Sequence, residues 1–318
     1  MSMLSYNRCK KIGVYVKIFL MSLTVEQKDK LLGIKPRFFF AIMLPFALCI
    51  ALGIYIWRLP FVWQDFFIFF VFYQVALFGI SVGNHRYFSH KSFKATPFFE
   101  FLLFFSSAVA FQTPAICWAA VHRKHHHHSD KGDDPHSPYF KEGRPLSFWE
   151  GFWHAHVMWI FGLDTLGIIK KYTQDLYHSE RLVKWHRFHM LIGISFLIIP
   201  GFIEAAMLGE FSVDNILRGV FWGGLFRVML LHNAVFLINS WGCHRGIGYR
   251  RNETSDQSTN NPLLFPFILG EAWHNNHHGS QTSANNAQKS IDIDPHFWML
   301  KGFEKLGWVS DIKDAHKS

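Results

Sequence analysis

The stretch FFFAIMLPFALCIALGIYIWRLPFVWQDFFIFFVFYQVALFGISVG, residues 38–83, decides the architecture of this chain. It contains two apolar runs, 38–57 and 61–83, which are joined by the short turn 58–60. About 20 apolar residues in a helix cross the hydrocarbon core of a bilayer, and a short connection makes consecutive helices antiparallel neighbours. Residues 38–83 therefore predict a transmembrane helical hairpin.

Further apolar runs follow at 98–121, 188–208 and 219–242, and the last two predict a second hairpin. The polar, His-rich regions 121–187 and 243–318 lie between and after these runs. We expect an all-α integral membrane protein, with four transmembrane helices in two hairpins and a cytoplasmic helical cap.

The expected domains are a basic cytoplasmic tail over residues 1–36, one domain over 37–310 and a C-terminal tail over 311–318. Lys and Arg are abundant in the first segment, which favours a cytoplasmic location. Met21 is an alternative start, because the sequence that follows it resembles an ordinary N-terminus.

The composition agrees with a membrane protein. Half of the 318 residues are hydrophobic and 35 are Phe, which is too apolar for an ordinary soluble domain. The formal charge of +9 comes without a recognisable nucleic-acid-binding module, and excess Lys and Arg is typical of the cytoplasmic face of membrane proteins. The four cysteines are scattered, which argues against a disulfide framework or a cysteine metal site.

Many of the 20 histidines fall in three tight clusters, HRYFSH (85–90), HRKHHHH (122–128) and HNNHH (274–278). Residues at i, i+3 and i+4 share one face of a helix. His122, His125 and His126 have this spacing, and so do His274, His277 and His278. Each triplet can direct three imidazoles to one place.

His85 and His90 are separated by five positions and diverge by roughly 140° on a regular helix. They need a helix end or a distorted turn, or they serve different metals. Imidazole suits zinc, copper, iron and nickel. The clusters hold more imidazoles than one ion can use, so the sequence predicts two metal ions.

The three clusters must share one side of the membrane if they form one site. The second cluster follows residues 98–121, and a complete crossing by that segment would place it opposite the first. We therefore predict that 98–121 is interfacial or re-entrant. Gln112, Thr113 and Pro114 in its middle suit a broken segment that protein covers.

In order and spacing, the three clusters resemble the histidine boxes of the membrane-bound fatty acyl desaturases, and most closely the delta-9 (stearoyl-CoA desaturase-like) branch. DPHS (134–137), INS (238–240) and GEAWHNNHH (270–278) extend the resemblance. It implies nine iron-ligating histidines: His85, His90, His122, His125, His126, His244, His274, His277 and His278.

The resemblance also implies an Asn that reaches the metal site through water, four positions before His244. Asn239 is five positions before it, so either a one-residue bulge restores the alignment or Ser240 takes the place. Arg227 is expected to support the site, or to have a buried structural partner. Asp134 and Glu271 are candidates to orient ligand imidazoles. The acyl tunnel is expected to be lined in part by Trp118 and Gln112.

The implied function is an O2-dependent acyl desaturase that uses two non-haem iron ions and introduces a cis double bond, expected at delta-9. The electron donor is expected to be a separate protein of cytochrome b5 or ferredoxin type, with its reductase. The expected location is the bacterial inner membrane or the endoplasmic reticulum, with the active site on the cytoplasmic side.

Several alternatives stay open. The acyl carrier is CoA, acyl carrier protein or a phospholipid, because Ala120, Val121, Leu163 and Asp164 stand where the animal acyl-CoA enzymes have basic residues. A membrane di-iron hydroxylase of fatty acids or alkanes would use similar histidines. A metal transporter or storage protein is a third class, although transport sites usually lie near the bilayer midplane.

Overall fold

The computed structural model describes residues 23–32, 36–244 and 247–315, and the side chains of residues 36–41 are outside this description. Most of the predicted basic tail and Met21 therefore lie outside the described residues. Among the described cysteines, Cys49, Cys117 and Cys243 are free and buried.

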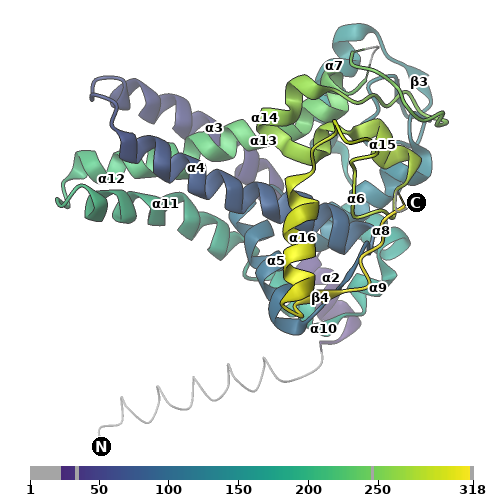
Figure 1. Cartoon of the computed structure of the whole chain (residues 1–318), viewed down its shortest axis with the longest axis horizontal. Helices are drawn as coiled ribbons and strands as arrows, with labels where there is room; N and C mark the ends of the chain where they lie inside the picture. Colours follow the sequence, from purple (N-terminus) through teal and green to yellow (C-terminus); the bar gives the residue numbers. More distant parts are fainter. Residues whose placement is uncertain (1–22, 33–35, 245–246, 316–318) are drawn as a thin grey trace, which may run out of the picture.

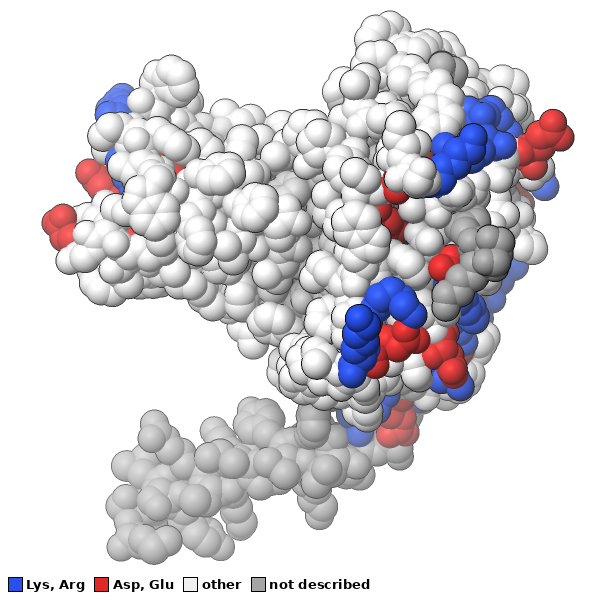
Figure 2. All heavy atoms as spheres, viewed as in Figure 1, with Lys and Arg blue, Asp and Glu red and all other residues white. Residues whose placement is uncertain are grey.

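The apolar helices form a bundle at one end of the molecule, and the polar regions form a cap at the other end (Figure 1). The bundle elements are α3 (Pro36–Ile56), α4 (Trp63–Phe78) with the π-helix η1 (Gly79–Ser89), α11 (His189–Met207), and α12 (Val213–Gly219), η3 (Val220–Phe226), α13 (Arg227–Leu237) and η4 (Ile238–Gly242). Figure 2 shows a bundle surface without charged residues between its far end and the cap.

Within the described residues, three continuous helices are long and apolar enough to span a membrane: Trp63–Ser89, His189–Met207 and Val213–Gly242. The remaining predicted span, residues 38–57, corresponds to α3, whose apolar part over Ile42–Ile56 is shorter than these three helices. The all-helical membrane fold is confirmed. The second helix continues to Ser89, beyond the predicted end at residue 83, and the last begins at Val213 rather than residue 219.

The segment after η1 is a bent pair of helices, α5 (Pro97–Ala110) and α6 (Ala115–His128), with an angle of 84° between them. The break contains Phe111, whose φ of 56° is left-handed, and it ends at Pro114. The break thus lies at the residues that suggested one in the sequence, and the interfacial or re-entrant course of residues 98–121 remains a prediction.

Small residues allow the spanning helices to approach closely. A Cβ on Gly219 would lie 2.3 Å from the Pro200 carbonyl oxygen, and one on Gly224 would lie 2.2 Å from that of Leu197. Such contacts are typical of membrane helix pairs. They fix α11 against the last spanning helix.

A buried ion pair joins the two hairpins at the end of the bundle far from the cap. The Arg218 guanidinium donates to Asp65 at 3.0 Å and to the Pro60 carbonyl oxygen at 2.8 Å. Asp65 also accepts a hydrogen bond from the Val62 amide at the start of α4. A paired, hydrogen-bonded carboxylate is the form in which a charge tolerates burial.

The cap consists of short helices and two small antiparallel strand pairs. One pair joins β1 (Lys94–Ala95) to β4 (Val309–Ser310) and thereby attaches the C-terminal segment. The other cap elements are α2 (Val25–Leu32), β2 (Phe140–Lys141), β3 (Arg144–Pro145), α7 (Phe148–His156), η2 (Met158–Gly162), α8 (Thr165–Tyr172), α9 (Gln174–Tyr177), α10 (Glu180–His186), η5 (Pro262–Leu264), α14 (Phe265–Ile268), η6 (Leu269–Ala272), α15 (His274–Gly279) and α16 (Pro295–Lys305).

Candidate metal centre

The first histidine cluster lies at the end of the second spanning helix, where the helix is a π-helix. The backbone amide of His90 donates to the carbonyl oxygen of His85 at 3.1 Å, which is the i→i+5 bond of that helix type. The distortion brings the two rings to 5.0 Å between centroids. The two histidines therefore belong to one group, and the distorted turn is the alternative that the structure supports.

The second and third clusters lie on regular α-helices. On α6, His122 and His126 face the first cluster, while His125 points to a different group. On α15, His277 joins the first group, and His274 and His278 join His125. Each cluster on these two helices thus contributes to two sites.

The first group has five histidines whose ring nitrogens converge on one point. The Nε2 atoms are 3.0 Å apart for His85 and His277, 2.8 Å for His90 and His122, and 2.9 Å for His126 and His277. Ligand nitrogens about 2.1 Å from an ion and at right angles to each other are separated by about 3 Å. The spacing fits a single metal ion.

The second group contains His125, His274 and His278, and all three are buried. The Nε2 atoms of His274 and His278 are buried without a hydrogen-bond partner. Unpaired buried nitrogens are costly unless they bind a ligand. The ring of His244 lies 5.7 Å from that of His274, beside this group.

Burial favours the neutral, metal-binding form of several of these imidazoles. It lowers the pKa of His90, His274 and His277 well below the usual histidine value, and neighbouring histidines add to the effect. A neutral imidazole offers one lone pair to a metal and keeps one N–H to donate elsewhere. The donor set therefore suits a cation.

Carboxylates lie beside the second ring nitrogen of some of these histidines. The Nδ1 of His85 lies 2.6 Å from Glu271, and the Nδ1 of His125 lies 3.0 Å from Asp134. Such partners fix the orientation of a ligand ring. Burial alone would raise the pKa of Glu271, but His85 and Arg86 outweigh it and hold that pKa well below the usual value.

Three more residues at the site were absent from the sequence prediction. Asp256 lies 2.8 Å from Nδ1 of His278, and Asp130 lies 3.9 Å from Nδ1 of His244. The ring of His136 lies 4.4 Å from that of His125. His136 is part of the DPHS motif, which could have indicated it, whereas no spacing rule in the sequence connects Asp256 to His278.

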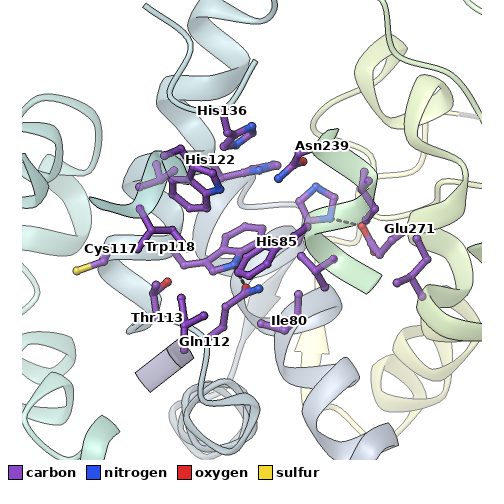
Figure 3. Close-up of a pocket in the computed structure, with 18 of the residues that line it drawn as sticks. Ile80, His85, Gln112, Thr113, Cys117, Trp118, His122, His136, Asn239 and Glu271 are labelled. Atoms are coloured by element: carbon purple, nitrogen blue, oxygen red, sulfur yellow. Dashed lines mark hydrogen bonds and ion pairs between the residues drawn. The ribbon is translucent and has the colours of Figure 1, made fainter. Parts of the chain in front are cut away.

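Another π-helix, η4, lies between α13 and His244 and bears on the alignment of Asn239. The Cys243 amide donates to the Ile238 carbonyl oxygen at 3.3 Å, again an i→i+5 bond. Asn239 lines the cavity beside the histidines (Figure 3). Ser240 points elsewhere, and its hydroxyl lies 3.0 Å from Nδ1 of His156. The bulged alternative, with Asn239 at the site, has the better geometric support.

An apolar cavity adjoins the metal groups, and we refer to it as the catalytic cavity. Trp118 and Gln112 line it, and the indole N–H donates to the Gln112 side-chain oxygen at 2.7 Å (Figure 3). The ring of Trp118 also stacks on that of His122 at 4.8 Å. Other lining residues are His85, His136, His274, Ile80, Thr113, Cys117, Phe236 and Glu271.

Arg227 does not contact the histidines. It is buried and donates to three backbone carbonyl oxygens, those of Gly223, Val109 and Phe196. Those carbonyls lie on three different helices, so Arg227 joins the bundle below the cap. Of the two predicted roles for Arg227, this geometry favours buried structural contacts over support of the metal site.

A separate polar depression reaches the metal groups from the surface. It is lined by His126 and His278 together with Lys131, Asp256 and the exposed His127. It shares no lining residue with the catalytic cavity. The two groups are thus approached by an apolar route and by a polar one.

Comparison with known proteins agrees with the site. A family model described as fatty acid desaturase matches residues 61–281. A hex-5-enoyl-[acyl-carrier protein] acetylenase from Moorena producens is 33% identical over 76% of this chain and 74% of its own. Delta-9 acyl-lipid desaturase 2 from Arabidopsis thaliana is 33% identical over 80% and 76%. An acyl-CoA C20 Delta5-desaturase from Anemone leveillei is 32% identical over 81% and 77%.

Proposed function

Because the chain belongs to the membrane fatty acid desaturase family, we propose that this oxidoreductase introduces a cis double bond at the delta-9 position of a saturated acyl chain. Relatives named for delta-9 activity support the position, including the sn-1 stearoyl-lipid 9-desaturase of Anabaena variabilis, at 29% identity. Other relatives are named for delta-5, delta-7 or acetylenase activity. The observation that carries the proposal is the convergence of two buried histidine groups beside an apolar cavity.

The proposed metals are two iron ions. The first would be held by His85, His90, His122, His126 and His277, and the second by His125, His244, His274 and His278. A di-iron centre supplies the O2-dependent oxidation that removal of hydrogen from an unactivated methylene requires. The neutral, closely spaced imidazoles support this assignment.

The protein's own residues position the acyl chain. The apolar walls of the catalytic cavity bind the alkyl chain and exclude water, while the hydrogen bond to Gln112 fixes Trp118 beside His122. The Nδ1–H of His85 donates to the Glu271 carboxylate, so the Nε2 lone pair faces the metal site. Precise placement of a methylene next to the oxidant determines which bond reacts.

The proposed electron donor is a separate protein of cytochrome b5 or ferredoxin type, with its reductase, that acts from the cytoplasmic side. The polar depression supports this part, because His126 and His278 approach the surface there without passing through the catalytic cavity. The positive charge of the whole chain would attract an acidic carrier.

The test is expression in a host with a defined lipid profile, fed with labelled stearate and palmitate. Gas chromatography should reveal new monounsaturated acyl chains, and derivatisation should locate the double bond at carbon 9. Purified protein should contain two irons per chain. Hydroxylated lipid without added unsaturation would refute the desaturase proposal, and a bond at another carbon would refute the delta-9 part.

A further inference from the structure

A second apolar cavity lies beside the catalytic cavity, and we refer to it as the lateral cavity. Its walls come from two bundle helices, α3 and α13, and from two cap helices, α7 and α14. Its lining residues are Ile42, Met43, Phe46, Phe152, Trp153, His156, Val157, Val228, Met229, Leu230, His232, Asn233, Ala234, Phe236, Leu237, Leu264 and Phe267. The lateral cavity therefore lies at the level where the bundle meets the cap.

The two cavities adjoin at a pair of apolar side chains. Ile42 of α3 and Phe236 of α13 line both of them, and each is buried. A route between the two cavities would pass these two side chains, and opening it by a change of their rotamers would leave the helices in place. Rotamer changes of this kind are far easier than backbone rearrangement. Only the side chains of Ile42 and Phe236 would thus separate an acyl chain in the lateral cavity from the catalytic cavity.

Exposed apolar side chains lie on, or next to, the two cap helices that line the lateral cavity. On α7, Trp149 is 67% exposed and Trp153 is 55% exposed, and next to α14 the exposed fraction of Leu263 is 79%. Large exposed apolar side chains at this level are expected to contact lipid. Trp is enriched at the membrane–water interface. These side chains suit contact with the bilayer on this side of the lateral cavity.

The types of residue that line the two cavities indicate which acyl carrier they suit. No Lys or Arg lines either cavity within the described residues, and the polar groups of the lateral cavity are only His156, His232 and Asn233. A CoA head group carries phosphates, which need cationic or amide partners. An alkyl chain whose head group remains in the membrane needs none. Burial of such a chain gains about 0.8 kcal/mol for each methylene group.

We propose that the lateral cavity admits an acyl chain that is still esterified to a membrane glycerolipid, and passes it between Ile42 and Phe236 to the metal site. This inference deepens the proposed function and rests on it. It assigns the substrate class as an acyl-lipid. The polar head group stays at the interface near α7 and α14, while the chain enters from the side.

Photo-crosslinking tests the inference without requiring turnover. The full chain is reconstituted in dioleoylphosphatidylcholine nanodiscs that contain phosphatidylcholine with a diazirine in its sn-1 stearoyl chain. Stearoyl-CoA with the same diazirine serves as the competing probe. Mass spectrometry should locate the lipid label on Met43, Met229 or Leu237, and the lipid should label these positions at least fivefold more than the CoA ester.

Substitutions that fill the lateral cavity should abolish this labelling. Met229→Trp and Ala234→Trp introduce a larger side chain at positions that line only the lateral cavity, and each should reduce the label at least fivefold. Ile198→Trp is the matched control, because Ile198 is 46% exposed on α11 and lines neither cavity. Its labelling should equal that of the wild type.

Two results would overturn the inference: equal lipid labelling in wild type and in a correctly folded Met229→Trp or Ala234→Trp protein, or stronger labelling of the lateral cavity by the CoA ester. Folding is checked by size-exclusion chromatography in detergent. Since labelling is independent of the reaction, a hydroxylated product in the expression experiment would refute the desaturase proposal and leave this result standing.

Discussion

The two histidine groups are built in different ways. The first takes His85 and His90 from the π-helical end of a spanning helix, and its ring nitrogens are within about hydrogen-bond distance of one another. The second lies among cap segments and is surrounded by three aspartates, Asp130, Asp134 and Asp256. The spanning helix therefore supplies two of the five histidines of the first group, and aspartates from irregular segments lie beside the histidines of the second.

This difference predicts which substitutions would disrupt each histidine group. The geometry of the first group depends on a helix that tertiary packing holds along its whole length. The second group depends on hydrogen bonds from polar segments far apart in the chain. Substitutions at matched positions of the two groups can test whether both halves are needed and which is more easily lost.

The largest effect is expected for His277→Ala and His278→Ala, which remove adjacent histidines that belong to different groups. Each should lower product formation by more than about 100-fold, beyond the loss typical of residues that only orient ligands. Each should also reduce the iron content. Gas chromatography and metal analysis measure the two effects, and a variant that keeps full iron content would show that its histidine is no ligand.

A smaller effect is expected for the carboxylates. Glu271→Gln and Asp256→Asn keep the side-chain shape and remove the charge that faces His85 and His278. Each should weaken metal binding by about 10- to 100-fold. Glu271→Gln should be the more severe, because Glu271 also pairs with Arg86 and accepts from Ser81.

Iron titration of purified Glu271→Gln and Asp256→Asn measures how much metal binding each variant has lost. Excess iron should restore more activity to Asp256→Asn than to Glu271→Gln. The reverse order would contradict the view that the spanning helix fixes the first group through Glu271.

A third comparison tests whether Asn239 or Ser240 supports the metal site. Asn239→Ala removes a polar group from the catalytic cavity and should reduce turnover roughly fivefold, as expected for about 1 kcal/mol. Ser240→Ala breaks only the contact with His156 and should remain within about twofold of wild type. Turnover of both variants in the same membranes provides the measurement, and equal losses would argue against the bulged alignment.

The smallest effect is expected for His127→Ala and His128→Ala. Both histidines belong to the run of four in HRKHHHH, yet neither falls in a metal group, and His128 contacts the Tyr172 hydroxyl at 2.9 Å. Activity and iron content should stay within about twofold, since surface substitutions are usually mild. Loss of one iron in either variant would require a different ligand set.

The sequence by itself determined the helical membrane class, because long apolar runs have few stable alternatives in lipid. It also determined which residues of HRKHHHH and HNNHH can act together, since i, i+3 and i+4 spacing is a local property of a helix. Glu271 was a candidate from the sequence, although its position three residues before His274 did not indicate its partner, His85.

Only the tertiary structure decided the rest. His85 and His90 share one group because a π-helix replaces a regular turn, and helix type depends on packing as well as on local sequence. Asp256 reaches His278 across 22 positions of mostly irregular chain. The lateral cavity lies between helices that no local pattern connects. Local spacing is fixed by covalent geometry, whereas contacts between distant segments arise only when the whole chain packs.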